Sequence, residues 1–243
     1  MIRTPDLDAD RPAPVMVLVG PGRHFGKALV NRFLAEGFSV GVLSGRQQTL
    51  DALRDELPAG ASVRFARTDV TEPEEFQRAL RDMVQGLGRL ECLIYNAKVS
   101  VKAGGLSTDL GELTKSLRVN VTGALAAIQS ATVLMEHSGR PSIILTGGGY
   151  KDRPHPEKFA LNVGKSGLHA VAKGLVDPLR LRGVKLQTVI IKGAIRQSDL
   201  SAAMATGSSD ELADFFWRIF QDQDRHVYRF PPRLVAATHP QLF

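Results

Sequence analysis

The stretch Val15-Met-Val-Leu-Val-Gly20-Pro-Gly22-Arg23-His24-Phe25-Gly26 decides the fold that this sequence predicts. Its first five residues are an apolar, β-rich run that ends at Gly20. An amphipathic pattern from His24 to Glu36 then predicts a helix. A glycine after a strand lets the backbone turn sharply, and the helix that follows presents free N–H groups and its positive dipole end. This order is typical of a phosphate-binding loop.

The alternation of apolar runs and amphipathic stretches continues along the chain, which predicts βαβ units and a parallel sheet. Strands are expected at residues 39–43, 63–66, 92–95, 142–145, 186–191 and 226–230. Helices are expected at residues 49–57, 73–84, 109–135, 157–181 and 210–220. We therefore predict an α/β fold, a single doubly wound Rossmann-like domain over residues 15–243 with a mostly parallel seven-stranded sheet. Residues 1–14 are polar and contain three prolines, so we expect a flexible N-terminal tail there.

The composition excludes several classes of protein. Cys92 is the only cysteine among 243 residues, so the chain can form neither an intrachain disulfide nor a cysteine metal cluster, and a reducing compartment, the cytoplasm, is expected. The histidines and acidic residues show no metal-ligand spacing, and no apolar run of about 18 residues predicts a membrane span. The net charge is +6, but lysine and arginine are scattered along the chain, so nucleic acid is not an expected partner.

Five further motifs follow the glycine loop. They are Thr68-Asp69-Val70-Thr71, Tyr95-Asn96-Ala97-Lys98, Val119-Asn120-Val121-Thr122-Gly123-Ala124, Leu161-Asn162-Val163-Gly164-Lys165 and Lys192-Gly193-Ala194-Ile195. In this order, from residue 15 to residue 230, they resemble the motifs of the short-chain dehydrogenase/reductase family. The resemblance implies a nicotinamide dinucleotide cofactor and a small carbonyl or alcohol substrate. It also implies a homodimer or homotetramer formed through the helices at 109–135 and 157–181.

The glycine loop departs in part from the family's Thr-Gly-x-x-x-Gly-x-Gly pattern. Gly20 and Gly26 match the first and third glycines of that pattern. His24 replaces the middle glycine, and Gly22 is expected to take over part of its role. The resemblance implies cofactor contacts for a wider set: Gly20, Gly22, Arg23, Phe25, Gly26, Arg46, Asp69, Val70, Asn96, Ala97, Lys165, Gly193 and Ile195.

The end of the second strand predicts which dinucleotide binds. Relatives that use NAD place a carboxylate there, which accepts hydrogen bonds from the ribose hydroxyls. Residues 39–48 contain no carboxylate, and Arg46 follows the strand. A guanidinium can hold the extra 2′-phosphate of NADP, which an acid would repel. Together with Arg23 at the helix entrance, Arg46 predicts NADP(H) in preference to NAD(H).

The resemblance implies an altered catalytic set. In the family a serine orients the carbonyl, a tyrosine transfers the proton, and a lysine lowers the pKa of that tyrosine and binds the ribose. Lys165 matches the lysine, which places Leu161 at the tyrosine position and Gly148 at the serine position. Asn120 matches the helix asparagine, which interrupts the helix and holds a water in the proton relay.

Two interpretations of the altered set remain open. In one, the chain is an NADP(H)-dependent oxidoreductase with a non-standard proton donor. Tyr150 lies close in sequence to the missing serine, and His155 can carry a proton near neutral pH. In the other, the chain binds the cofactor without turnover, as an inactive or regulatory protein. Loss of a protein acid–base group should slow the reaction by roughly 10²–10⁴-fold.

Two segments near the C-terminus border the predicted cleft. Residues 198–210 are rich in small side chains and are expected to form a mobile lid. Phe215, Phe216 and Trp217 form an aromatic cluster on the helix that follows. They are expected either to cover the substrate or to pack, in the core or against another subunit.

Overall fold

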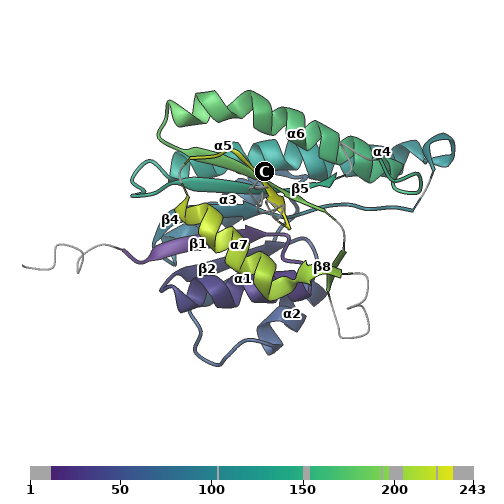
Figure 1. The fold of residues 1–243 in the computed structure, drawn as a ribbon. Helices are drawn as coiled ribbons and strands as arrows, with labels where there is room; N and C mark the ends of the chain where they lie inside the picture. The colour runs from purple at the N-terminus through teal and green to yellow at the C-terminus, as the bar shows by residue number, and fades with distance from the viewer. Residues whose placement is uncertain are drawn as a thin grey trace, which may run out of the picture.

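The computed structural model describes residues 12–102, 104–149, 154–192, 194–196, 205–222 and 224–231. Its main sheet has seven strands in the order β3-β2-β1-β4-β5-β6-β9, and every neighbouring pair is parallel (Figure 1). The strands are β1 (Pro14–Val19), β2 (Ser39–Ser44), β3 (Val63–Arg67), β4 (Arg89–Tyr95), β5 (Ser142–Gly148), β6 (Lys185–Ile191) and β9 (Val227–Phe230). The predicted doubly wound sheet is confirmed, with β1 beginning one residue before the expected boundary.

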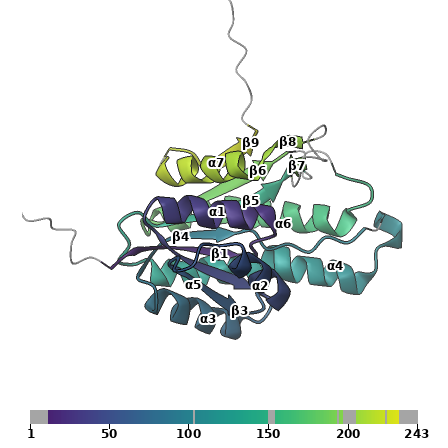
Figure 2. The ribbon, with the colours of Figure 1, turned by 90° about the horizontal axis from the view of Figure 1, so that it is seen from below.

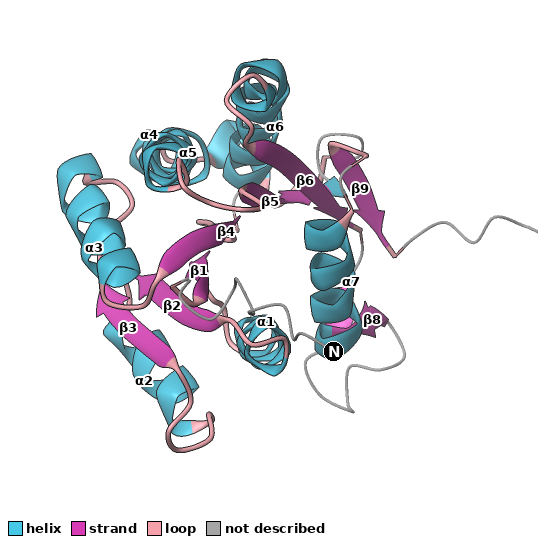
Figure 3. Ribbon diagram, turned by 90° about the vertical axis from the view of Figure 1, so that its left-hand side faces the viewer, coloured by secondary structure: helices cyan, strands magenta, loops and turns pink. Residues whose placement is uncertain are grey.

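Helices cover both faces of this sheet (Figure 3). One face carries α1 (His24–Ala35), α2 (Gln47–Asp55) and α7 (Ser209–Gln221), and α1 and α7 lie side by side in Figure 2. The other carries α3 (Pro73–Gln85), α4 (Leu110–Leu117), α5 (Gly123–Leu134) and α6 (Phe159–Arg180). The order of the strands reverses between β1 and β4. In sheets of this kind a ligand binds outside the carboxyl ends of the strands at that reversal.

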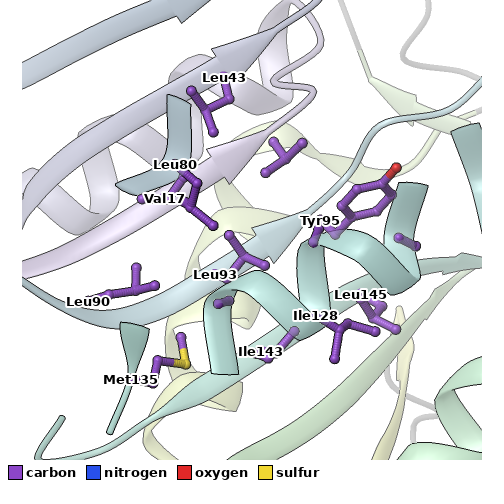
Figure 4. Close-up of a cluster of buried hydrophobic side chains, with 14 of the residues drawn as sticks. Val17, Leu43, Leu80, Leu90, Leu93, Tyr95, Ile128, Met135, Ile143 and Leu145 are labelled. Atoms are coloured by element: carbon purple, nitrogen blue, oxygen red, sulfur yellow. The ribbon is translucent and has the colours of Figure 1, made fainter. Parts of the chain in front are cut away.

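The period-two alternation of β1 builds a core on each face. Val17 points toward α3 and α5, where it joins Leu93, Ile128 and Ile143 (Figure 4). Met16 and Leu18 point the other way, toward α1 and α7. All of these side chains are buried, and burial of each contributes about 1.5–3 kcal/mol. The strand that leads into the glycine loop is thus held from both sides.

The aromatic residues of α7 pack in the core on the face of the sheet that α1 and α7 cover. Phe216 and Trp217 are buried, and Trp217 packs edge-to-face on Phe33 of α1, with ring centroids 5.2 Å apart. Phe215 contacts Phe230 of β9, with ring centroids 5.4 Å apart. Of the two expectations for this cluster, packing in the core agrees with the structure.

The helix expected at residues 109–135 is interrupted. It consists of α4, a π turn at Arg118–Thr122 and α5. By length and composition alone, the stretch Leu110–Leu134 could cross a membrane, although the sequence was expected to contain no such run. Half of its most apolar window is buried inside the fold, where it packs against α3, β4 and α6. Its apolar character is therefore accounted for by the core.

Two short strands lie outside the main sheet. β7 (Ala194–Arg196) and β8 (Ala205–Ser208) pair in parallel, and α7 begins directly after β8. Ser208 and Glu211 form a reciprocal capping box at that helix start, which satisfies two N–H groups. Part of the predicted lid at 198–210 is therefore regular structure, and residues 197–204 lie outside the described residues.

Candidate cofactor and active site

The glycine loop after β1 packs against Asn96 and Ala97, the two residues that follow β4. Gly20 has φ +74°, and a Cβ added there would lie 2.5 Å from Ala97 Cα. A Cβ on Gly26 would lie 2.5 Å from the carbonyl oxygen of Pro21. Gly22 has φ +65°, but its surroundings are open, with only the Asn96 amide 3.8 Å away. The loop thus requires glycine at 20 and 26 for space, and at 20 and 22 for backbone conformation.

Asn96 holds the loop in place across the reversal of strand order. Its backbone N–H donates to the carbonyl oxygen of Val19 over 2.8 Å, and its side-chain amide donates to that of Gly20 over 2.6 Å. Asn96 was predicted to contact the cofactor. In the structure its side-chain amide nitrogen donates to the loop, and its predicted contact with the cofactor stays a prediction.

Two pockets lie near the ends of β2 and β3, and one of them borders the loop. One, of about 350 Å³, has Gly22, Arg23 and Arg46 in its lining. The other, of about 370 Å³, is lined by Gly45, Arg67, Asp69 and Glu75. Arg67 was missed by the sequence analysis. It lies in register with Ser44 of β2, a pairing that the spacing of residues does not reveal.

The one acid in the first pocket is neutralised by a neighbour. Glu56 lies 2.9 Å from Lys27 Nζ, and both side chains are solvent-exposed. The hydrogen bond and charge of Lys27 lower the pKa of Glu56, and the charge of Arg23 adds to this. Because Lys27 offsets this carboxylate, the pocket keeps the basic character that Arg23 and Arg46 give it.

Three other residues predicted to contact the cofactor, Asp69, Val70 and Phe25, differ in their surroundings. Asp69 accepts a hydrogen bond from the Thr71 N–H over 2.9 Å, and Val70 beside it is buried. Phe25 packs edge-to-face on Phe216 at 5.2 Å between ring centroids, so its side chain belongs to the α1–α7 core. Only the backbone of Phe25 stays at the helix entrance.

Asn120 sits in the π turn that separates α4 from α5, as its resemblance to the helix-interrupting asparagine implied. The side chain is fully buried, and its amide nitrogen donates to the carbonyl oxygen of Ser116 over 3.0 Å. Among the described residues, its Oδ1 has no hydrogen-bond partner. Gly164 of α6 packs directly on it, since a Cβ at 164 would lie 2.9 Å from Asn120 Cβ. A buried acceptor without a donor marks a place for a water or ligand N–H or O–H group.

Ser116 joins this cluster and was also missed by the sequence analysis. Its hydroxyl donates to the Ala160 carbonyl oxygen over 2.9 Å, which ties α4 to the start of α6. Serine within an amphipathic helix carries no specific signal in the sequence. Only the crossing of α4 and α6 brings it beside Asn120.

Lys165 lies on the same helix face as Leu161, one turn later. Both are buried, with 6% and 2% of their surfaces exposed. The Lys165 ammonium donates to the Thr146 carbonyl oxygen over 2.8 Å, near the carboxyl end of β5. Burial, with a smaller contribution from the charge of Lys98, lowers the pKa of Lys165 to about 7.

The structure describes one of the two alternative proton donors and part of the last motif. Tyr150 and Gly193 lie outside the described residues. His155 is exposed, and its Nδ1 accepts a hydrogen bond from the Glu157 N–H over 3.2 Å, which fits a rigid surface turn before α6. Ile195 is half-buried in β7.

These residues fit a dinucleotide. Gly20 closely approaches Ala97 after β1 and β4, Arg23 and Arg46 line a basic pocket after β2, and Asn120 carries a buried oxygen with no donor among the described residues. Among the described residues, no group of three or more histidine, cysteine or acidic side chains could hold a metal ion.

Comparison with known proteins agrees with this architecture. A family model described as short chain dehydrogenase matches residues 14–206. The oxidoreductase asL5 of Sarocladium schorii is 28% identical over 178 residues, 71% of this chain and 69% of that protein. Glucose 1-dehydrogenase of Gluconobacter oxydans is 24% identical over 184 residues, 74% of this chain and 69% of that protein.

Solved structures share the fold. A short-chain dehydrogenase/reductase from Serratia marcescens superimposes with a TM-score of 0.76 at 23% identity, covering 90% of this chain and 96% of that chain. ElxO, solved with NADP bound, has a TM-score of 0.77 at 17% identity, with the same coverage of 90% and 96%.

Proposed function

Because this chain belongs to the short-chain dehydrogenase family, we propose that it is an NADP(H)-dependent oxidoreductase of a small carbonyl or alcohol that works without the family's serine and tyrosine. One observation carries the proposal: Lys165 is buried at the carboxyl edge of β5, one helical turn after Leu161 and directly after Gly164, which packs on Asn120. Leucine at position 161 and glycine at position 148 have no proton to give.

The preference for NADP(H) rests on charge. Arg23 and Arg46 line one pocket at the end of β2, and Lys27 offsets Glu56 there. A 2′-phosphate in this pocket would meet two guanidinium groups, each able to bind phosphate oxygens in a bidentate manner. The free N–H groups at the start of α1 would hold the pyrophosphate. ElxO, a protein of the same fold, was solved with NADP bound.

Residues on the other half of the crevice would hold the nicotinamide end. When bound, the nicotinamide supplies or accepts the hydride. Lys165 would bind the ribose, and the unpaired Oδ1 of Asn120 would accept from an ordered water. The backbone of Ile195 in β7 would donate to the carboxamide. We also propose a homodimer or homotetramer formed through α4, α5 and α6.

Binding of the two cofactors tests the first half of the proposal. Wild-type protein is titrated with NADPH and with NADH, followed by fluorescence, beside Arg46→Ala and, as a control, Arg180→Ala. Loss of a charge-assisted hydrogen bond costs about 1.5–3 kcal/mol, which corresponds to roughly a 10–100-fold weaker NADPH complex for Arg46→Ala. Arg180 lies at the far end of α6, so its variant should bind as wild type does. Equal losses for NADPH and NADH would contradict the assigned preference, and absence of binding would contradict the whole proposal.

Turnover tests the second half. The protein is mixed with the cofactor that binds and with a panel of small aldehydes and ketones, and oxidation of the cofactor is followed by absorbance. We expect slow turnover with at least one compound. Binding without any turnover would instead support the regulatory interpretation, in which the double variant Leu161→Tyr and Gly148→Ser is expected to restore activity.

A further inference from the structure

The face of α6 that carries Leu161, at the family's tyrosine position, also carries Lys165, and His169 follows one helical turn later. Residues 161 and 165 are four apart, so their side chains lie on one face of the helix. Lys165 is 6% exposed, and its ammonium reaches the Thr146 carbonyl oxygen at 2.8 Å. An ammonium has three N–H donors. The hydrogen bond to Thr146 uses one of them, which leaves donors for a ribose hydroxyl and for a substrate oxygen.

The hydroxyl groups of Ser116 and Tyr95, on neighbouring elements, are committed to hydrogen bonds elsewhere. The Ser116 hydroxyl donates to the Ala160 carbonyl oxygen over 2.9 Å. The Tyr95 hydroxyl donates to the Val119 carbonyl oxygen over 2.6 Å, and burial raises the pKa of Tyr95 far above its ordinary value. Asn120 is an amide and does not titrate. Among the described residues of this cluster, Lys165 is therefore the group whose geometry and chemistry suit proton transfer.

The electrostatic surroundings of Lys165 set its proton affinity. Its hydrogen-bond partner on β5, the Thr146 carbonyl oxygen, is uncharged, and the titratable His169 lies one helical turn further along α6. The charged group acting on it is Lys98, which is exposed and follows β4. Burial first and the like charge of Lys98 second lower the pKa of Lys165 to about 7, so the amine can both hold and release a proton near neutral pH.

We infer that Lys165 is itself the proton donor of the reaction, in place of the missing tyrosine, and that Lys98 tunes it. As the hydride of the reduced nicotinamide forms the new C–H bond, an N–H bond of the Lys165 ammonium breaks and the substrate oxygen gains that proton. The nicotinamide is oxidised and the carbonyl is reduced to the alcohol. The neutral amine of Lys165 then regains a proton from water. This inference rests on the proposed oxidoreductase function.

Direct titration of the amine is the first test and needs neither cofactor nor substrate. The protein is prepared with ¹³Cε-labelled lysine, the Lys165 signal is assigned with Lys165→Arg, and its chemical shift is followed against pH. We expect a midpoint near 7 that moves upward in Lys98→Gln, because a like charge is removed. Lys102→Gln, an exposed lysine of the same loop, should leave the midpoint unchanged. A midpoint at the ordinary lysine value of about 10.4 would overturn the inference.

The second test separates proton transfer from ribose binding. Lys165→Arg keeps the positive charge and N–H donors, but arginine has a pKa above about 12 and does not release a proton at neutral pH. We expect NADPH binding within a few-fold of wild type and a kcat lower by roughly 10²–10⁴-fold. In the wild type, kcat for carbonyl reduction should fall as pH rises through the pKa of Lys165, and Lys98→Gln should move that fall to higher pH.

The outcomes distinguish this inference from the proposed function. If Lys165→Arg keeps its kcat, or if the pH profile is the same in Lys98→Gln, Lys165 only binds the ribose and the inference is wrong while the oxidoreductase function stands. If cofactor binds and the wild type turns over no aldehyde or ketone, both fail together. If no cofactor binds, the proposed function fails at its first step.

Discussion

The Tyr95 hydroxyl donates a hydrogen bond to the Val119 carbonyl oxygen over 2.6 Å, which links the last residue of β4 to the π turn that carries Asn120. Figure 4 shows Tyr95 at one edge of the buried cluster, with its hydroxyl pointing away from the apolar side chains beside it. A π turn leaves backbone carbonyls without the regular partners of an α-helix. The tyrosine satisfies one of them, so the end of β4 and the altered helix are positioned together.

We predict that Tyr95→Phe destabilises the protein. The substitution removes the hydroxyl and leaves the Val119 carbonyl oxygen without that donor, which should cost about 1–3 kcal/mol in the free energy of unfolding. Urea unfolding followed by circular dichroism measures this loss, and the denaturant slope should stay constant. A change below about 0.5 kcal/mol would show that the bond does not hold the turn.

Two glycines that both have a positive φ should respond differently to substitution by alanine. Gly20 and Gly37 both have positive φ, +74° and +81°, but only Gly20 is crowded by Ala97. Gly37→Ala should lower the free energy of unfolding by about 1–2 kcal/mol and leave NADPH binding unchanged. Gly20→Ala should cost more and abolish detectable binding, because the loop must move away from β4. Thermal unfolding and NADPH titration of both variants check this, and equal behaviour would contradict the close approach.

Glu91 should stabilise the fold in a pH-dependent way. This buried carboxylate of β4 accepts hydrogen bonds from the Ser138 hydroxyl, the Gly139 N–H at 3.0 Å, the Arg140 N–H at 2.7 Å and the Arg89 guanidinium at 2.6 Å. Burial alone would raise the pKa of Glu91, but these bonds, led by that from Ser138, lower it below 4.5. Its stabilisation is therefore present above the unfolded pKa and is lost as pH falls through the folded pKa.

Glu91→Gln should accordingly lose about 1.5–3 kcal/mol of stability at pH 7, with the difference from wild type closing in acid. Glu72→Gln is the matched control, because the exposed pair between Glu72 and Arg118 should contribute at most about 1 kcal/mol. Denaturant unfolding from pH 7 down to pH 3 measures both. A loss for Glu91→Gln that does not change with pH would argue against a charged, hydrogen-bonded Glu91.

Lys165 should also make stability rise with pH, but over a higher range of pH than Glu91. The pKa of Lys165 is about 7 in the folded chain and 10.5 as the ordinary value, so between these limits the unfolded chain holds more protons and stability rises with pH. Below pH 7 the buried ammonium destabilises the folded chain, because each tenfold loss of proton affinity on folding corresponds to about 1.4 kcal/mol. Lys165→Met should therefore be more stable than wild type at pH 6, with the gap narrowing toward pH 10. A gap that is constant over this range would show that Lys165 titrates normally.

Much of this protein follows from local sequence pattern. The alternating β1 run, the glycines at 20 and 26, and the helix that starts at His24 are consequences of period, turn chemistry and helix entry, which act over a few residues. The parallel sheet follows because the chain repeats this unit. Asn120 and Lys165 could be singled out because the residues around each of them also resemble a motif of the family.

What the sequence determined by itself is therefore the strand–loop–helix order, the positions of the motifs along it, and the absence of an acid at the end of β2. The tertiary structure decided where the helix at 110–134 breaks, that α7 packs its aromatic residues on α1, and that Arg67 and Ser116 join the site. It also decided that Lys165 is buried and lies within reach of the like charge of Lys98. These features depend on contacts between residues far apart in the chain and on the loss of water around them, and neither is encoded in the spacing of neighbouring residues.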